Sequence, residues 1–215
     1  MTRGVRRFEA VLFDVGGVLT TSLGPIMAAK VAGAGMSFLD FLPFGLGPLE
    51  TDTDHPFHRL ERGEISLDEA ESAIRLSLAA AGFTAPMSFP GREEMFAGLQ
   101  TVPEMIDLVA EVRAAGYATA IVSNCIEAWD GWSGVLDSDA LVDVVIDSCR
   151  VGLRKPDRRI FELAMDRLGV VPERTLFIDD FPWNLPAAQD LGITTVHCTD
   201  HTIAVSELRS LLRLS

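Results

Sequence analysis

The chain has 215 residues, of which 48% are hydrophobic, and it carries a formal net charge of −13 with a pI of about 4.6. This length suits one sizeable core with a smaller appendage, and the hydrophobic content excludes a disordered chain. Because an acidic surface repels phosphate backbones and anionic lipids, we expect neither a nucleic acid nor a membrane as partner. No apolar run reaches the roughly 20 residues of a membrane-spanning helix.

The three cysteines, Cys125, Cys149 and Cys198, are odd in number and far apart in the sequence. They show neither a disulfide framework nor the spacing of a zinc finger. The basic N-terminal residues are not followed by an apolar run of signal-peptide length. These features predict a cytoplasmic protein in a reducing compartment.

The first expected element is a short apolar strand over 8–14, which ends on Asp14 and runs into two glycines. A helix is expected over 25–35, followed by loop and short helix between 37 and 56. Ser66 and Glu69 form a capping-box pattern at the start of a helix that ends at Gly82. Residues 84–91 are interpreted as a linker.

Apolar strands and helices alternate from residue 102 onward. The expected helices cover 103–116, 156–169, 184–192 and the residues after 198, and the expected strands cover 117–124, 141–148, 175–180 and 193–198. Strands that are apolar throughout indicate a parallel sheet with helices on both faces. We therefore predict an α/β fold with a doubly wound parallel, Rossmann-like sheet: a core domain over 1–20 and 97–215, and an inserted helical cap domain over 21–96.

Polar groups stand where the expected strands end. They are Asp14, the pair Ser123 and Asn124, and the pair Asp179 and Asp180, with Lys155 in a loop after the strand at 141–148. Each alone is typical of a turn or a helix cap. In a parallel sheet, however, ligands bind outside the carboxyl ends of the strands, so the set is expected to share one crevice.

The chemistry of this set suits a phosphate ester. Crowded carboxylates favour a hard cation such as Mg²⁺. A lysine, a serine hydroxyl and backbone amides bind phosphate oxygens, and a carboxylate acts as a nucleophile toward phosphorus. Positioning and charge neutralisation are most of what phosphoryl transfer needs.

Four motifs in order resemble the haloacid dehalogenase superfamily: FDVGGVL (13–19), IVSN (121–124), RKPDRRIFE (154–162) and FIDDFPWNLPAA (177–188). The resemblance covers about 8–20 and 100–200. In addition, ERGEIS (61–66) resembles the cap of the branch that holds the phosphatase domain of soluble epoxide hydrolases and a bacterial sugar-phosphate phosphatase. This resemblance implies Mg²⁺-dependent hydrolysis of a small phosphorylated metabolite through a phospho-aspartate.

The resemblance also implies a role for each matching residue. Asp14 is then the nucleophile and a metal ligand, and the backbone carbonyl of Gly16 is a second ligand. Asp180 is the third protein ligand, with Asp179 beside it in the inner or outer shell of the metal. Asn184 falls where many relatives carry a further acid or an asparagine.

The phosphate side of the expected site follows from the same resemblance. Ser123 and the backbone amide of Asn124 hold the phosphate. Lys155 pairs with the nucleophile and with the phosphoryl oxygens. The cap closes over the substrate and excludes water.

Gly16 departs from the pattern, because most phosphatases of the superfamily carry a second aspartate there as general acid and base. General acid–base catalysis raises a reaction rate on the order of 10²–10⁴-fold, so we expect turnover that is slower but not abolished. Groups of the cap that could substitute are His55, His58 and Glu61, besides Asp52 and Asp54. The histidines are otherwise an exposed loop pair. The remaining explanations are a substrate with a good leaving group, or a weak catalyst kept for binding.

Two other functions are compatible with these residues. A metal-independent 2-haloacid dehalogenase uses the same aspartate, but it has less reason to keep the acid pair at 179 and 180. A binding module would use the exposed aromatic residues, which are Phe38, Phe41, Phe44, Trp129, Trp132, Phe181 and Trp183. They otherwise pack the cap core and the sheet edge. As an alternative, those at 129, 132, 181 and 183 line the substrate entrance or form a homodimer contact.

Overall fold

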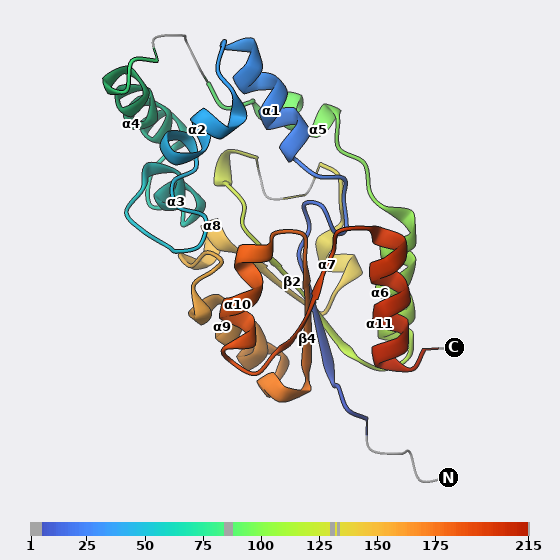
Figure 1. The fold of residues 1–215 in the computed structure, drawn as a ribbon. Coiled ribbons are helices and arrows are strands. Elements are labelled where there is room, and N and C mark those ends of the chain that lie inside the picture. The colour runs from blue at the N-terminus through green and yellow to red at the C-terminus, as the bar shows by residue number, and fades with distance from the viewer. Residues whose placement is uncertain (1–5, 84–87, 130–131, 133, 215) are drawn as a thin grey trace, which may run out of the picture.

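The structure is a computed structural model that describes residues 6–83, 88–129, 132 and 134–214 (Figure 1). Its centre is a sheet of five parallel strands in the order β3-β2-β1-β4-β5. The strands are β1 (Ala10–Phe13), β2 (Ala118–Ser123), β3 (Val144–Asp147), β4 (Thr175–Asp179) and β5 (Thr194–His197). This arrangement confirms the predicted doubly wound parallel α/β fold.

Helices cover both faces of the sheet, as Figure 1 shows. On one face, α6 (Pro103–Ala114) and α11 (His201–Leu212) pack on β1 and its neighbours in one hydrophobic cluster. On the other face, α9 (Arg158–Leu168) and α10 (Leu185–Gln189) pack in a second cluster. Burial on both faces explains why the strands are apolar throughout.

The register of the central strand fixes where the functional groups lie. Phe13, the last residue of β1, pairs with Ile121 of β2 and with Ile178 of β4. The residues that follow these positions therefore leave the sheet at the same edge. Asp14, Ser123 and Asp179 are brought together by this register, although they are far apart in the sequence.

A layer of short helices lies beyond that edge of the sheet (Figure 1). It contains α1 (Gly24–Gly33), α2 (Phe38–Gly45), α3 (Pro56–Glu61), α4 (Leu67–Ala80) and α5 (Arg92–Ala97). A third hydrophobic cluster holds the layer together and includes Phe41 and Ile74. The predicted capping box begins α4: Ser66 accepts from the Glu69 amide and the Glu69 carboxylate accepts from the Ser66 amide.

The third strand is shorter than predicted. The sequence predicts a strand over 141–148, but α7 (Ser138–Leu141) occupies its start and β3 begins at Val144. The Asp143 carboxylate accepts hydrogen bonds from the Thr119 amide at 2.8 Å and from the Thr119 hydroxyl at 2.9 Å. A side chain therefore takes the place of a strand carbonyl at this position. Next, α8 (Ser148–Val151) follows β3 directly and precedes the loop to Lys155.

Several short elements were not predicted. These are α3, α5, α7, α8 and the 3₁₀ turns η1 (Glu127–Trp129), η2 (Pro172–Arg174) and η3 (Pro182–Asn184). Of the predicted linker 84–91, residues 84–87 lie outside the described residues, and 88–91 have no regular secondary structure. Elements of three to six residues carry too few repeats of any hydrophobic period to be recognised from sequence.

No single helix in the described ranges is long and apolar enough to cross a membrane. Helices α1 and α2 meet the length and composition criteria only when taken together, and they are bent by 101° where they meet.

Candidate active site

Lys155 lies between two carboxylates at the carboxyl edge of the sheet. Its Nζ is 2.8 Å from Asp14 Oδ1 and 2.6 Å from Asp179 Oδ2. The lysine side chain is only 1% exposed, and both carboxylates are buried. Burial opposes its charge, but Asp14 and Asp179 raise the pKa of Lys155. The lysine is therefore held charged, and removing either carboxylate would leave a buried charge less compensated.

Asp179 has its hydrogen-bonding capacity filled by the protein. Besides Lys155, it accepts from the Phe181 amide at 2.8 Å and from Asn184 Nδ2 at 3.0 and 3.2 Å. Both of its oxygens are thus occupied by donors. This pattern suits a group that orients Lys155 more than one that faces a substrate.

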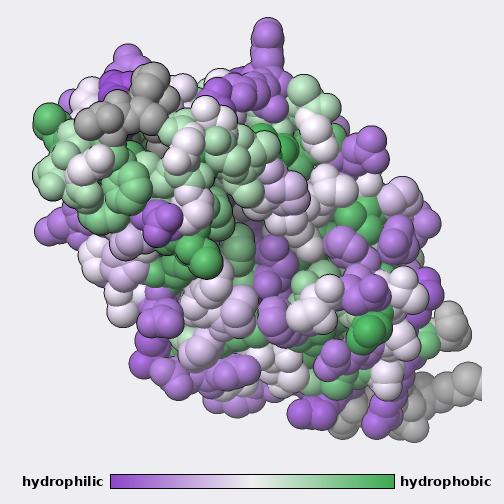
Figure 2. Space-filling view, turned by 45° about the horizontal axis from the view of Figure 1, so that its top comes forward, coloured by the Kyte–Doolittle hydropathy of each residue, from purple (hydrophilic) through white to green (hydrophobic). Residues whose placement is uncertain are grey.

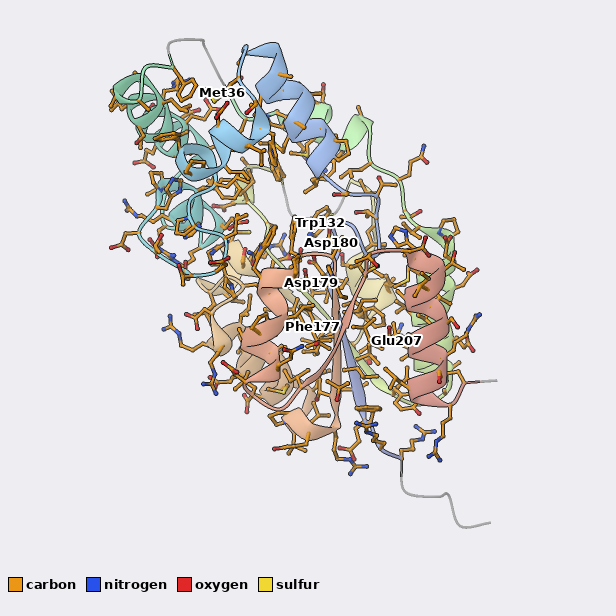
Figure 3. The ribbon with its side chains drawn as sticks, viewed as in Figure 1. Met36, Trp132, Phe177, Asp179, Asp180 and Glu207 are labelled. Atoms are coloured by element: carbon orange, nitrogen blue, oxygen red, sulfur yellow. The ribbon has the colours of Figure 1, made fainter. Side chains whose placement is uncertain are left out.

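Asp180 differs from its neighbour. Its Oδ1 is buried without a hydrogen-bond partner, and ligand oxygens of Asp14, Asp179 and Asp180 all lie within 4.8 Å of one another. Figure 3 shows Asp179 and Asp180 at the end of β4 beside Trp132, above Phe177 in the sheet. Such a buried, unsatisfied oxygen is costly unless something binds it, and a carboxylate cluster is the donor set that Mg²⁺ prefers.

The raised pKa values of Asp14 and Asp180 also indicate that the carboxylates of this cluster repel one another. Burial, with Asp179 adding to it and Lys155 opposing it, raises the pKa of Asp14 to about 6. Burial together with Asp14 and Asp179 raises the pKa of Asp180 to about 8. One buried lysine thus does not neutralise the cluster, and a bound cation would relieve the repulsion.

Gly17 makes room for the Asp180 carboxylate. Its φ is +78°, and a Cβ at this position would lie 2.1 Å from Asp180 Oδ2. The second of the two glycines after Asp14 is therefore required both by the backbone and by the close approach of the acid. The sequence shows the glycine but not the neighbour that requires it.

Ser123 and Asn124 stand opposite the acids. The Trp132 Nε1–H donates to Ser123 Oγ at 3.0 Å, and the Ser123 hydroxyl itself donates to the Asn124 carbonyl at 3.4 Å, a long hydrogen bond that a phosphate oxygen could replace. The Asn124 side chain donates to the Lys155 carbonyl at 3.0 Å and accepts from the Lys155 amide at 2.8 Å. Asn124 therefore joins the loop after β2 to the loop that carries Lys155.

Apolar groups face the side-chain position of Gly16. A Cβ there would lie 3.4 Å from Trp132 Cη2 and 3.7 Å from Leu23 Cδ1. A methyl group would fit, but a longer acidic side chain would be directed at the indole and the leucine. Among the described residues, the atoms nearest to this place belong to Trp132 and Leu23 and not to a carboxylate.

Of the five residues that the sequence offers as acid or base, Asp52, Asp54, His55, His58 and Glu61, only Glu61 lines the cavity described below. Arg154 Nε donates to Glu61 Oε2 at 2.6 Å, and burial raises the pKa of Glu61 although Arg154 opposes it. His55 Nε2 lies 3.0 Å from the Phe44 carbonyl, and His58 Nδ1 accepts from the Thr53 amide at 3.0 Å. His58 is buried, which lowers its pKa to about 3, so its interpretation as an exposed loop residue is wrong.

A cavity of about 290 Å³ connects these polar groups to the helical layer. Asp14, Ser123, Asn124, Lys155 and Asp180 lie at one end. Apart from Ser22, Glu61, Arg154 and Asn184, the remaining lining is predominantly apolar and includes Leu23, Met27, Phe38, Leu42, Leu46, Leu49, Phe57, Met95, Ile126, Trp129, Trp132, Phe181 and Trp183. In Figure 2, hydrophobic surface gathers on the side of the helical layer and around a hollow near the middle of the face.

The aromatic residues singled out from the sequence mostly belong to this cavity. Phe38, Trp129, Trp132, Phe181 and Trp183 line it, whereas Phe41 lies in the core of the helical layer. Sequence reasoning missed two partners: Arg154, which binds Glu61, and the Trp132 indole, which binds Ser123. Arg154 directly precedes Lys155 in its motif, which is the only signal that the sequence offered for it.

A family model for haloacid dehalogenase-like hydrolases matches residues 8–192. The chain belongs to this family. It is 32% identical to acyl-CoA dehydrogenase family member 10 of Mus musculus over 97% of the chain, and 29% identical to bifunctional epoxide hydrolase 2 of Rattus norvegicus over 71%. The chain spans only 20% and 30% of the length of these two relatives. The second match confirms the resemblance to the epoxide hydrolase branch.

A relative of similar length is the sesquiterpene phosphatase astK of Aspergillus oryzae, which is 26% identical over 95% of this chain and 97% of its own. An (S)-2-haloacid dehalogenase of Burkholderia cepacia is 34% identical over 46% of this chain and 43% of its own. Among solved structures, a haloacid dehalogenase family enzyme of Bacteroides thetaiotaomicron, in complex with magnesium and inorganic phosphate, shares the fold. Its TM-score is 0.61 at 21% identity, over 88% of this chain and 93% of its own.

We predict that Gly17→Ala disrupts the acid cluster because the methyl group would collide with the Asp180 carboxylate. Gly35→Ala is a matched control, since Gly35 has a φ of +73° but no atom within 4 Å of the place that a methyl group would take. The control is expected to lose about 1–2 kcal/mol of stability from backbone strain alone. Gly17→Ala is expected to lose more in urea denaturation, and to lose magnesium-dependent thermal stabilisation. Equal losses and retained magnesium stabilisation in both variants would contradict this.

Proposed function

We propose that this hydrolase cleaves a phosphomonoester with the help of Mg²⁺, through a phosphorylated Asp14. The observation that supports this most is the buried, unpartnered Asp180 oxygen next to Asp14, on the rim of a cavity that also holds Ser123 and Lys155. A cation and a phosphate would each complete one side of this arrangement. The donors present on both sides suit those two ligands.

In the proposed reaction, Asp14 attacks the phosphorus and the alcohol departs. Lys155, Ser123 and the amide of Asn124 bind the phosphoryl oxygens. Asp14, Asp180 and the Gly16 carbonyl would hold Mg²⁺, which when bound neutralises charge on the phosphoryl group. Asp179 orients Lys155 through their ion pair. Water then hydrolyses the phospho-Asp14 and releases phosphate.

Glu61 is the proposed proton donor for the departing alcohol. It is the one residue among the five candidates that lines the cavity, and burial raises its pKa although Arg154 opposes this shift. His55 and His58 are held by contacts within the cap instead. Their part is to stabilise the backbone between α2 and α3.

The cavity lining indicates a substrate whose alcohol is apolar. Apart from the phosphate-binding end and the Glu61–Arg154 pair, aliphatic and aromatic side chains surround the space that the ester would occupy. A sugar would leave most of its hydroxyl groups without partners there, which costs binding free energy. The similarity to a sesquiterpene phosphatase agrees with this assignment.

The similarity to a 2-haloacid dehalogenase supports the dehalogenase alternative, but that function accounts for fewer of the residues in the site. A dehalogenase of this family uses the aspartate without a metal, and the unpartnered Asp180 oxygen then has no purpose. We retain three further proposals from the sequence: the division into core 1–20 and 97–215 and cap 21–96, a cytoplasmic location, and homodimer formation.

The function is tested with p-nitrophenyl phosphate and with 2-chloropropionate. We expect turnover of the phosphate ester that needs Mg²⁺ and stops with a chelator, and none of the chloro-acid. Asp14→Asn is expected to lower turnover by at least about a thousandfold, because the amide is not a nucleophile. Asp190→Asn, at an exposed position outside the site, is the matched control. Metal-independent turnover of the chloro-acid would instead establish the dehalogenase.

The substrate class is tested with a series of n-alkyl phosphates. Each added methylene is expected to raise kcat/KM by up to about fourfold, since burial of a CH₂ is worth about 0.8 kcal/mol, until the cavity is full. Glucose 6-phosphate is expected to be a poor substrate, with a low kcat/KM. Leu42→Ser should weaken this dependence, whereas Leu39→Ser, on the exposed face of the same helix, should not. A flat series would refute the apolar assignment.

Glu61 is tested by comparing two leaving groups. Glu61→Gln is expected to lower kcat for octyl phosphate by roughly a hundredfold, because an alkoxide needs a proton to leave. The loss for p-nitrophenyl phosphate should be much smaller, since p-nitrophenolate leaves unprotonated. Equal losses with both esters would show that Glu61 acts only through its ion pair with Arg154.

A further inference from the structure

Two cysteines that are far apart in the sequence meet beside the phosphate-binding loop. The Sγ atoms of Cys125 and Cys149 are 3.0 Å apart. Cys125 directly follows Ser123 and Asn124 and lines the cavity, and Cys149 is the second residue of α8. Cys125 is buried and Cys149 is half-buried. The spacing of the cysteines predicts no disulfide framework, but the fold brings these two together.

The backbones on both sides of this pair are fixed by Ser148. Its hydroxyl accepts from the Cys125 amide at 2.9 Å and lies 2.7 Å from the Glu61 carbonyl, to which it donates. The Cys149 carbonyl lies against Gly63, where a Cβ would come within 2.3 Å of it. The two sulfurs therefore face each other at a junction of the phosphate-binding loop, α8 and the helical layer.

We propose that Cys125 and Cys149 are a redox-active pair that a hydroperoxide closes to a disulfide, and that this bond displaces the phosphate-binding loop. A disulfide is about 2.05 Å long, so the sulfurs must approach by roughly 1 Å. Because the close contact between Gly63 and the Cys149 carbonyl restricts α8, the loop that carries Cys125 takes up much of this movement. Ser123 and Asn124 would move with it.

Oxidation of the two thiols by a hydroperoxide needs no group from the candidate active site. The Cys149 thiolate attacks one oxygen of the hydroperoxide, which releases water or an alcohol and leaves a sulfenic acid on Cys149. The Cys125 thiol then attacks the Cys149 sulfur, forms the S–S bond and releases water. Two thiols lose two electrons and two protons in total, and the hydroperoxide is reduced. A dithiol reductant reverses the reaction by exchange.

The order of the two steps follows from access and hydrogen bonding. Cys149 is the more exposed thiol, and a hydrogen bond from the Cys125 thiol lowers its pKa. Cys125 is the buried partner that resolves the sulfenic acid. The third cysteine, Cys198, is buried at the end of β5, and burial raises its pKa to about 12, so it serves as an internal control.

The bond is tested on the full, folded chain by treatment with hydrogen peroxide, alkylation of the remaining thiols and peptide mapping by mass spectrometry. We expect a Cys125–Cys149 disulfide in the unmodified chain and in Cys198→Ser, which dithiothreitol reverses. In Cys149→Ser the bond is expected to be absent. If both thiols stay free to alkylate, or oxidise singly without forming the bond, the proposal is overturned.

The effect on the loop rests on the proposed function and is measured separately. Peroxide is expected to lower kcat/KM for p-nitrophenyl phosphate by roughly tenfold to a hundredfold, because small displacements of positioning groups are costly. Cys149→Ser should be fully active and resist peroxide. Equal inactivation of this variant, or a disulfide that leaves activity unchanged, would overturn the loop displacement. If no ester is turned over in the reduced state, the phosphatase proposal fails, and the mass measurement still decides the disulfide.

Discussion

The ion pairs between Lys155 and the carboxylates of Asp14 and Asp179 are the interaction on which the site depends. A buried ammonium group is costly unless it is compensated, and here the compensation comes from the ends of two neighbouring strands. The parallel register of β1 and β4 places those two acids side by side. The lysine in turn offsets their repulsion, so the three charges maintain one another in a nearly water-free position.

The single charge of Lys155 does not compensate all the carboxylates at this edge of the sheet. Asp180 adds a third carboxylate whose Oδ1 has no partner in the described structure, and Gly17 is shaped to admit it. A site built only for stability would not keep such a group buried. Under the proposed function, the polar end of the cavity would bind the cation and the phosphate, and the apolar lining would bind the hydrocarbon part of the ester.

The sequence predicted those features that follow from local pattern and from one topological rule. The apolar strands and their polar ends indicated Asp14, Ser123 and Asp179 at a single edge, and the structure brings them together there. The capping box at Ser66 was equally local.

Features that depend on tertiary packing could not be predicted in this way. The indole that covers Gly16, the arginine that pairs with Glu61 and the contact between Cys125 and Cys149 each join residues far apart in the sequence. The burial of His58 has the same origin, since only the folded helical layer covers it. The predicted start of β3 was wrong because the Thr119 amide of the neighbouring strand donates to the Asp143 carboxylate instead of to a backbone carbonyl.

The double hydrogen bond between the Asn124 side chain and the backbone of Lys155 has a consequence for how tightly a phosphate can be held. It joins the backbone that follows Ser123 to the backbone of Lys155 before any ligand binds. Little conformational entropy then remains to be lost when phosphate binds, so more of the interaction energy is expressed as affinity. In the proposed reaction the same rigidity would also hold the inorganic phosphate product, so that its release would limit turnover.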